Sequence, residues 1–278
     1  PIHRQALPQH CRDQSKIGGT PNTTTGTVLA SEWARLNPAE TGRPKIQRGC
    51  SVSQTTHKAH IQSVVDLISQ RLEPKCRTVI AIAGPPGSGK TTLADAVVRQ
   101  LNEQSIEAPE FKATILPMDG YHRSNDELDR LGLRRRKGAV NTFDAAGFSA
   151  ALEALSDDKR VHRLPGFDRR NDCVVPDRII VEASTRIIVT EGNYLLLNRV
   201  PWRDLRALYA ASVFVKAPLE VLKARLLERW RDQHLSPQEA QQKVTENDLP
   251  NAALVLQESM SADLVIEHAV HDALVQVS

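Results

Sequence analysis

The feature that most constrains the fold of this 278-residue chain is a glycine-rich segment that directly follows a short apolar run. Residues 78–83 read TVIAIA, the continuously apolar, β-branched pattern of a strand that is buried on both faces of a parallel sheet. Residues 84–91 read GPPGSGKT and match the phosphate-binding loop GxxxxGK[ST], and a helical pattern follows. Because strand, loop and helix occur in this order, the sequence predicts a nucleotide-binding α/β domain.

Each residue type in this loop has a physical reason. Glycines allow backbone conformations in which several N–H groups point inward at phosphate oxygens. Lys90 is expected to bring its positive charge to the β and γ phosphates, and the Thr91 hydroxyl is expected to bind Mg²⁺. The expected cofactors are therefore ATP and Mg²⁺. The predicted nucleotide-binding residues are Gly84, Pro85, Pro86, Gly87, Ser88, Gly89, Lys90, Thr91 and Thr92.

Apolar runs and helical stretches alternate along the rest of the chain. An apolar stripe over 61–72 predicts a helix before the first strand. Because strands and helices alternate, we expect a three-layer α/β/α sandwich of the P-loop NTPase type, with a mainly parallel sheet and a helical lid. Further strands are predicted at 113–118, 186–190 and 211–215, and helices near 91–103, 144–156 and 218–232.

Composition separates the first 55 residues from the rest. Residues 1–55 are rich in Ser, Thr, Pro, Gly and Arg and carry a net charge of +4, which leaves 3 − 4 = −1 for the remainder. We therefore predict a disordered arm over 1–55 and a folded domain over 56–278. The basic, acid-poor arm keeps a mitochondrial transit peptide open as an alternative to a plain flexible extension.

The balanced charge of the predicted domain and its few aromatic residues, 4% of the chain, argue against a nucleic-acid partner. Four scattered cysteines without CxxC spacing indicate a reducing compartment. The sequence contains no run of about 18 apolar residues, so we expect no membrane partner. We expect a soluble cytoplasmic protein that acts on a small molecule, and a homodimer stays open.

Two carboxylates follow predicted strands. Asp119 ends the strand at 113–118, where ligands bind in open α/β sheets, so it is a candidate general base for an acceptor hydroxyl or a Mg²⁺ organiser. Since Asp-Gly also favours turns, a plain turn residue is the alternative. Glu191 follows the apolar strand residues in the run IIVTEG (187–192) and is a candidate second metal-organising acid, with a solvated strand-end Glu as its alternative.

The helix predicted near 218–232 carries Arg225 and Arg229 beside an apolar face, and a polar segment over 232–247 follows it. This arrangement is typical of a lid, here near 225–250, whose arginines neutralise developing phosphoryl charge. A solvated charged face is the alternative. The chain lacks the Asn/Thr-Lys-x-Asp element of GTPases and the LSGGQ signature of ABC-type ATPases.

Several stretches resemble the kinases related to uridine kinase, type I pantothenate kinase and phosphoribulokinase, and most closely fructose-transport-system-kinase-like proteins. They are AIAGPPGSGKTTLA (81–94), MDGYH (118–122), LGLRRRKGAVNTFD (131–144), PGFDR (165–169), IIVTEGNYLLL (187–197) and ERWRDQHLSPQEAQQKVTENDLPNA (228–252). The resemblance implies that Asp119 approaches the acceptor hydroxyl, that Glu191 is the second-strand acid, and that Arg225 and Arg229 act from the lid. It implies an acceptor site that includes Tyr121, His122, Phe143, Asp144, Asn193 and Tyr194.

Some residues in these stretches have looser assignments. Asn247 and Asn251 resemble asparagines near the acceptor in pantothenate kinases. Lys137 and the arginines at 134–136 place positive charge beside the predicted site, which would suit an anionic acceptor, and a solvated basic loop is the alternative. The sequence thus predicts an ATP-dependent kinase for an alcohol group on a sugar, sugar acid, pantothenate-like compound or nucleoside. A regulatory nucleotide-dependent ATPase without a small-molecule acceptor is the competing hypothesis.

The predicted arm can be tested by truncation. Deleting residues 1–50 should leave nucleotide binding and phosphoryl transfer near their wild-type levels, because this segment has too little apolar content to contribute much to a core. Nucleotide affinity and melting temperature of the truncated and full-length chains provide the comparison. Aggregation, or a much lower melting temperature, would contradict the predicted boundary.

Overall fold

The computed structural model describes residues 50–72, 76–157 and 160–267. The predicted arm lies outside these residues except at its end, where the first described helix already begins at Cys50. The elements that form the domain are α2 (Cys50–Ser69), β1 (Thr78–Ala83), α3 (Lys90–Gln104), β2 (Ala113–Pro117), α4 (Asn125–Arg130), α5 (Ala145–Asp157), β3 (His162–Asp168), β4 (Cys173–Val181), β5 (Ile187–Gly192), β6 (Ala211–Lys216), α6 (Leu219–Asp232), α7 (Pro237–Lys243), α8 (Leu249–Glu258) and β7 (Leu264–Glu267).

The main sheet has the strand order β2-β5-β1-β6-β7, and every neighbouring pair in it is parallel. This confirms the predicted α/β fold with a mainly parallel sheet. In the register, Glu191 of β5 lies opposite Ile82 of β1 on one side and Pro117 of β2 on the other. The carboxyl ends of these three strands therefore lie side by side at one edge of the sheet.

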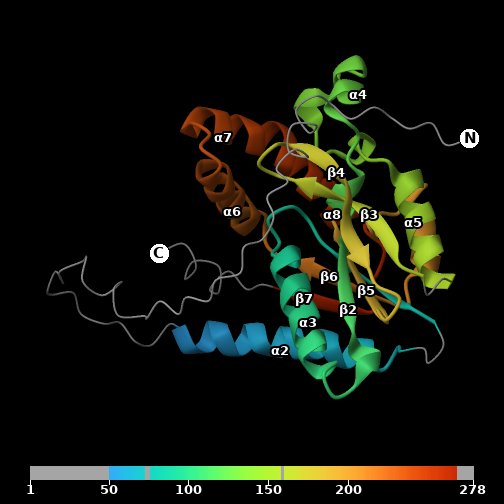
Figure 1. Cartoon of the computed structure of the whole chain (residues 1–278). Coiled ribbons are helices and arrows are strands. Elements are labelled where there is room, and N and C mark those ends of the chain that lie inside the picture. The colour runs from blue at the N-terminus through green and yellow to red at the C-terminus, as the bar shows by residue number, and fades with distance from the viewer. Residues whose placement is uncertain (1–49, 73–75, 158–159, 268–278) are drawn as a thin grey trace, which may run out of the picture. The chain divides into compact units, whose positions relative to one another are not determined.

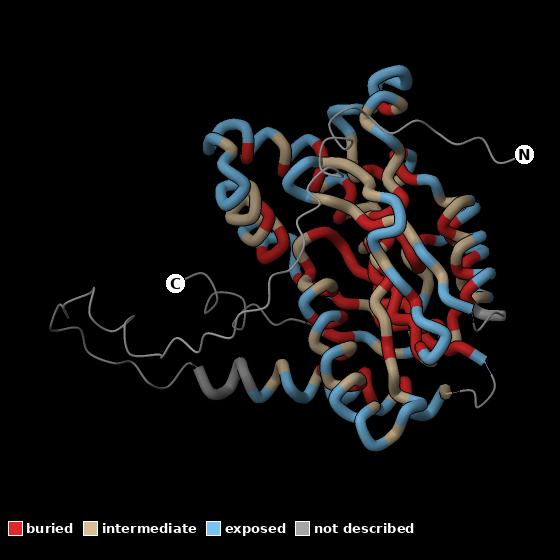
Figure 2. The backbone as a smooth tube through the Cα atoms, viewed as in Figure 1, coloured by how far each residue is buried: buried red, intermediate tan, exposed pale blue. Residues whose placement is uncertain are grey.

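Helices cover both faces of this sheet (Figure 1). Successive side chains of a strand point to opposite faces, and β1 therefore divides its apolar residues between two cores. Ile80 and Ile82 pack with α2 and α3, whereas Val79, Ala81 and Ala83 face a core that contains residues of α5 and α8. Figure 2 shows buried residues, in red, concentrated in the middle of the domain, and every residue of the central strands β1 and β5 is buried. The predicted three layers are thus confirmed.

A smaller cluster holds the helical segment that the sequence predicts as a lid. Leu222 and Leu226 of α6 pack with Val244 and with Ala252 of α8. The polar stretch between them forms α7, which begins at a capping box between Ser236 and Glu239, and then a π-helical turn, η8 (Val244–Asp248). Such π-helical turns occur frequently at functional sites.

The sequence does not predict the hairpin β3–β4, which forms a two-stranded antiparallel sheet of its own. Its strand β3 lies against the 3₁₀ turn η4 (Met118–Tyr121) that follows β2. Gly120 permits this approach, because a Cβ at that position would lie only 2.4 Å from the carbonyl oxygen of Pro165. The hairpin is thereby seated directly beside Asp119.

Within the described ranges, none of the helices combines the length and the apolar character that a membrane crossing would need. In the described part of the chain, Cys76 and Cys173 are free thiols.

The contact at Gly120 gives a test of the fold. Gly120→Ala should lower the free energy of unfolding by about 1–3 kcal/mol, because the added methyl group overlaps a backbone carbonyl that cannot move alone. The comparison is Gly132→Ala, where a Cβ would meet nothing within 4 Å and only the positive φ of 66° opposes the substitution. Denaturant unfolding of both variants measures the difference. Equal losses would contradict the close packing of the hairpin on this turn.

Candidate active site

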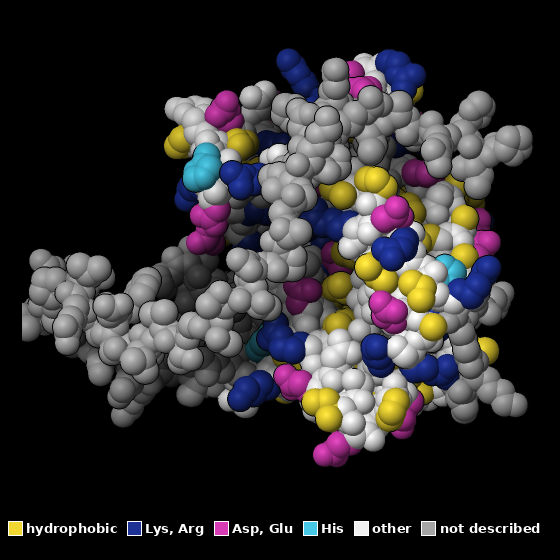
Figure 3. Space-filling view, viewed as in Figure 1, with side chains coloured by type: hydrophobic (Ala, Val, Ile, Leu, Met, Phe, Trp, Pro, Cys, Tyr) yellow, Lys and Arg dark blue, Asp and Glu magenta, His cyan; other side chains and the backbone are white. Residues whose placement is uncertain are grey.

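A cavity of about 490 Å³ lies at the carboxyl ends of the central strands. Its walls come from the P-loop, the turn that holds Asp119, the loop before α5, the tip of the β3–β4 hairpin, the end of β5, and the helices from α6 to α8. Six basic residues of the described ranges line it: Lys90, Arg134, Lys137, Arg169, Arg229 and Lys243. Figure 3 shows several Lys and Arg side chains, in dark blue, on this face of the domain. The cavity is therefore positively charged on several walls.

The P-loop turns between β1 and α3 and has the geometry that phosphate binding requires. Gly87 and Gly89 have φ values of 81° and 88°, and Gly89 is the N-cap residue of α3. Gly84 lies behind the loop, where a Cβ would be 2.5 Å from the carbonyl oxygen of Val215. The loop thus directs backbone N–H groups and the positive end of a helix dipole into the cavity, which fits a nucleotide phosphate.

Lys90 is buried at the start of α3, and its Nζ lies 3.5 Å from the carbonyl oxygen of Pro85. Burial lowers the pKa of Lys90, whereas the carboxylates of Glu191 and Asp119 oppose that shift. A buried ammonium is costly without anionic partners. The group is therefore well placed to neutralise a phosphate that enters the loop.

Thr91, in the first turn of α3, contacts Glu191 near the carboxyl end of β5. The Thr91 hydroxyl donates to Glu191 Oε2 over 3.1 Å, and Glu191 is only 3% exposed. Burial raises the pKa of this carboxyl, Asp119 adds to the rise, and Lys90 acts against it. A hydroxyl and a carboxylate at this spacing fit a Mg²⁺ ion, which takes one or two protein oxygens and completes its shell with phosphates and water.

Asp119 lies on η4, two residues beyond the end of β2, and its side chain is 26% exposed. Its Oδ2 forms an ion pair with Arg169 Nη2 at 3.1 Å. Burial would raise the pKa of Asp119, but His122 and Arg169, together with Lys90, outweigh it and lower that pKa. The carboxylate is thus held ionised at the cavity wall.

His122 forms an aromatic wall with two phenylalanines. Its ring lies between Phe143, with the centroids 4.1 Å apart, and Phe167, with the centroids 4.7 Å apart. Its Nδ1 is 2.8 Å from the carbonyl oxygen of Asp119, and burial lowers its pKa against the charge of that residue. A flat, largely apolar surface therefore stands next to the carboxylate.

The helical side of the cavity presents two basic residues around an indole. Trp230 lies against Arg229, at 5.4 Å from its guanidinium carbon, and against Lys243 Nζ at 4.2 Å. The indole N–H donates to Asp248 Oδ2 of the π-helical turn over 2.5 Å. Arg229 Nε is buried without a hydrogen-bond partner among the described residues. Since an unsatisfied guanidinium N–H is costly, this atom is suited to an incoming anion.

The structure brings many of the predicted site residues to one cavity. They are Pro86, Gly87, Gly89, Lys90, Thr91, Thr92, Asp119, His122, Phe143, Glu191, Asn193, Arg229 and Asn251. Asn193 Oδ1 is also buried without a partner in the described part of the chain. An acceptor hydroxyl could supply that missing hydrogen bond.

Other predicted residues lie outside the cavity lining. Arg225 donates to the carbonyl oxygens of Gly87 and Ser88 over 3.3 and 3.4 Å, on the outer side of the P-loop. Tyr121 and Tyr194 are buried, and the Tyr194 hydroxyl donates to the carbonyl oxygen of Gly138 over 2.7 Å.

Asp144 is likewise outside the lining, at the amino end of α5. It accepts there from the backbone N–H of Gly147 over 3.0 Å. These residues of the matched motifs thus support the walls of the cavity from behind. Asn247 does so too, since its amide donates to the carbonyl oxygen of Lys137 over 2.9 Å.

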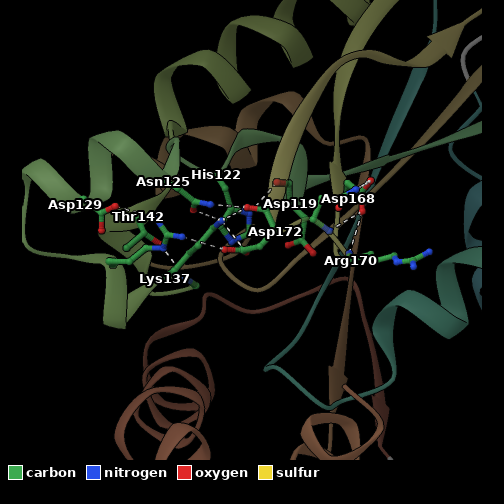
Figure 4. A network of polar contacts seen from close by, with 12 residues as sticks. Asp119, His122, Asn125, Asp129, Lys137, Thr142, Asp168, Arg170 and Asp172 are labelled. Atoms are coloured by element: carbon green, nitrogen blue, oxygen red, sulfur yellow. Dashed lines mark hydrogen bonds and ion pairs between the residues drawn. The ribbon is translucent and has the colours of Figure 1, made fainter. Parts of the chain in front are cut away.

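Sequence reasoning missed the contribution of the hairpin tip. Phe167, Arg169 and Asp172 all line the cavity. The short PGFDR match is the signal for Phe167 and Arg169, and it does not reach Asp172. Lys137, for which the sequence left a solvated loop open, is instead bonded to Asn125 Oδ1 and to both the carbonyl and the carboxylate of Asp172, at 2.7 to 2.8 Å (Figure 4). It fastens the loop before α5 to the hairpin.

Comparisons with known proteins agree with this geometry. The chain is 34% identical over 214 residues to the uncharacterized protein YggC of Escherichia coli, covering 77% of this chain and 86% of that protein. It is 35% identical over 204 residues to a candidate uridine kinase, C227.14, of Schizosaccharomyces pombe, covering 70% and 85% of the two chains.

A solved structure is similar as well. A candidate fructose transport system kinase from Silicibacter sp. TM1040 superimposes with a TM-score of 0.69 at 35% identity, covering 74% of this chain and 98% of that one. The model of the phosphoribulokinase and uridine kinase family matches residues 79–273. With a P-loop, two strand-end acids and a shared cavity already in place, these matches establish that the chain belongs to the phosphoribulokinase/uridine kinase family.

Proposed function

We propose that this chain transfers the γ-phosphoryl group of ATP to a hydroxyl group of a small metabolite. The observation that carries the proposal is that one cavity joins a phosphate-binding wall to a second wall of different chemistry. The first wall holds Lys90, Thr91 and Glu191, and the second holds Asp119 beside an aromatic surface. A protein that only hydrolysed ATP would have no need of the second wall.

Phosphoryl transfer needs little covalent chemistry from the protein, so positioning and electrostatics carry most of the catalysis. The acceptor oxygen bonds to the γ-phosphorus while the bond from that phosphorus to the β–γ bridging oxygen breaks and ADP leaves. The proton of the acceptor hydroxyl passes to the Asp119 carboxylate. Mg²⁺ held near Thr91 and Glu191 would neutralise phosphate charge during this step.

The helices α6 to α8 complete the site from the other side. Arg229 carries the buried N–H that lacks a partner, and we assign it to the charge that develops on the transferred group. Arg225 holds two carbonyl oxygens of the P-loop, and we assign it a positioning role. The acceptor classes compatible with this arrangement are sugars, sugar acids, pantothenate-like compounds and nucleosides.

The direct experiment is a coupled assay of ADP release with purified protein, Mg-ATP and a panel of sugars, polyols, hydroxy acids, pantothenate and nucleosides. Release that depends on one class of hydroxyl compound supports the proposal. Release that no small molecule changes, but that a protein or nucleic acid raises, would support a regulatory ATPase instead.

Lys90→Ala tests the phosphate-binding wall. Productive ATP use should be lost, because the variant has no ammonium for the β and γ phosphates. The domain should remain folded, since the P-loop backbone and the core on either face of β1 are unchanged. Turnover and melting temperature should be measured on the same preparation. Turnover at the wild-type rate would remove the argument for this wall.

Asp119→Asn tests the acceptor wall, because it keeps the size of the side chain and removes its charge. If Asp119 is the general base, phosphoryl transfer should fall by roughly 10² to 10⁴-fold while Mg-ATP affinity changes little. If it mainly organises Mg²⁺, nucleotide binding should weaken and become more dependent on Mg²⁺.

The matched control is Asp126→Asn, an exposed carboxylate of α4 outside the cavity lining. It should leave both turnover and Mg-ATP affinity at the wild-type level. If Asp119→Asn behaves like this control, Asp119 is a turn residue only, and the proposed acceptor wall is wrong.

A further inference from the structure

We propose that Arg169 selects the acceptor by binding an anionic group, a carboxylate or a phosphate, that lies a few bonds from the hydroxyl to be phosphorylated. In the structure the Arg169 guanidinium is paired with the Asp119 carboxylate. When the acceptor binds, its anionic group takes the place of that carboxylate as the partner of Arg169. This inference rests on the proposed function and names the chemical class of acceptor that the cavity takes.

The pair itself indicates an exchange. Arg169 Nη2 donates to Asp119 Oδ2 over 3.1 Å, so the guanidinium engages an oxygen that an acceptor hydroxyl would use. The Arg169 side chain is 48% exposed. A half-exposed ion pair contributes little net free energy, because water and salt screen it. Replacing Asp119 by an anionic group of the acceptor therefore costs the protein little.

The backbone that carries Arg169 is fixed, so the side chain is the part free to change partners. Asp168 closes the turn by accepting from the N–H groups of Arg170 and Asn171 over 3.0 and 3.1 Å. On the far side of the turn, Asp172 is held by Lys137 at 2.8 Å (Figure 4). The hairpin tip thus presents Arg169 to the cavity from a rigid base.

The other basic groups on this side of the cavity are already engaged. The Lys137 ammonium has three hydrogens and donates to three oxygens, one of Asn125 and two of Asp172. Arg134 pairs with carboxylates too, at 3.1 Å from Asp129 and 4.0 Å from Asp172.

On the opposite side, Lys243 lies over the Trp230 ring. Arg229, which we assign to the transferred phosphoryl group, lies close enough to Arg169 and Asp119 that both affect its pKa. Among the cavity-lining basic residues in the described ranges, Arg169 is the one that forms an ion pair with the proposed base itself. An anionic group a few bonds from the reacting hydroxyl would therefore lie within reach of this guanidinium.

Geometry limits the size of that acceptor. A hydroxyl that bonds to Asp119 and an anion that bonds to the neighbouring guanidinium have oxygens about 4–6 Å apart, given hydrogen bonds of ordinary length. That separation corresponds to a hydroxyl and an anionic group only a few bonds apart, as in a short hydroxy acid or a short polyol phosphate. A long acceptor with its carboxylate far from the reacting hydroxyl would leave Arg169 unused.

The inference is tested with acceptors in matched pairs, one member charged and one neutral. Glycerate and glycerol 3-phosphate are each compared with glycerol, ribose 5-phosphate with ribose, and pantothenate with its neutral alcohol. We expect the short charged compounds to be preferred by roughly 10- to 100-fold in kcat/KM, the value of a charge-assisted hydrogen bond. The carboxylate and phosphate members distinguish the two sources of the anion.

Arg169→Ala should remove this preference, mainly by raising KM for the charged member, while the neutral member is little changed. Arg169→Lys should restore part of it, because the positive charge remains. The matched control is Arg170→Ala, the next residue in the same turn, whose side chain extends away from Asp119 (Figure 4). This control should keep the wild-type preference.

Each outcome decides the matter. Equal use of charged and neutral members by the wild type, or an unchanged preference in Arg169→Ala, would overturn the inference and leave the proposed function standing. A lower melting temperature of Arg169→Ala with unchanged acceptor preference would show that Arg169 only holds the hairpin in place. That result would also overturn the inference. If no compound in the panel raises ADP release, the proposed function fails and the inference fails with it.

Discussion

Glu191 lies opposite Ile82 in β1 and opposite Pro117 in β2, and the position of every other group in the site depends on this parallel register. The ladder of hydrogen bonds places the end of β5 between the P-loop that follows β1 and the turn that follows β2. Thr91 can therefore donate to Glu191, and Asp119 faces the same cavity. Because side chains alternate along a strand, a shift of one residue would turn Glu191 into a core.

The central elements could be predicted from the sequence because local patterns determine them. The run at 78–83 matches β1 residue for residue, and the P-loop motif defines the start of α3. The strand predicted at 186–190 is β5, which continues through Glu191 to Gly192. In each case the apolar pattern of a doubly buried strand and a distinctive turn occur within a few residues.

The hairpin and the ion pair could not be predicted in this way. Strand β3 contains Pro165 and Gly166, and only Val181 of β4 is buried, so neither shows the regular alternation that marks a strand. Arg169 meets Asp119 across 50 residues of sequence through tertiary packing alone. Arg225 and Arg229 are one helical turn apart and look equivalent in sequence, yet only Arg229 lines the cavity, because Arg225 stops at the P-loop carbonyls.

Lys137 connects three segments that surround the Arg169–Asp119 ion pair. Its ammonium is bonded to the hairpin at Asp172, and its carbonyl oxygen accepts from Asn247 of the π-helical turn over 2.9 Å. Burial lowers the pKa of Lys137, while its hydrogen bond to Asp172 opposes that shift, so the charge is retained by its partners rather than by water. The loop, the hairpin and the helical segment are therefore linked through this one residue.

The ion pair between Arg169 and Asp119 would also disfavour the transfer of phosphate to water. While Arg169 engages the Asp119 carboxylate, one of the oxygens that could position a nucleophile is occupied. A water molecule has no anionic group with which to draw the guanidinium away, whereas an anionic acceptor does. Since binding energy from a remote part of the substrate can release the groups that act at the reacting centre, recognition of the acceptor and release of its base would then be one event.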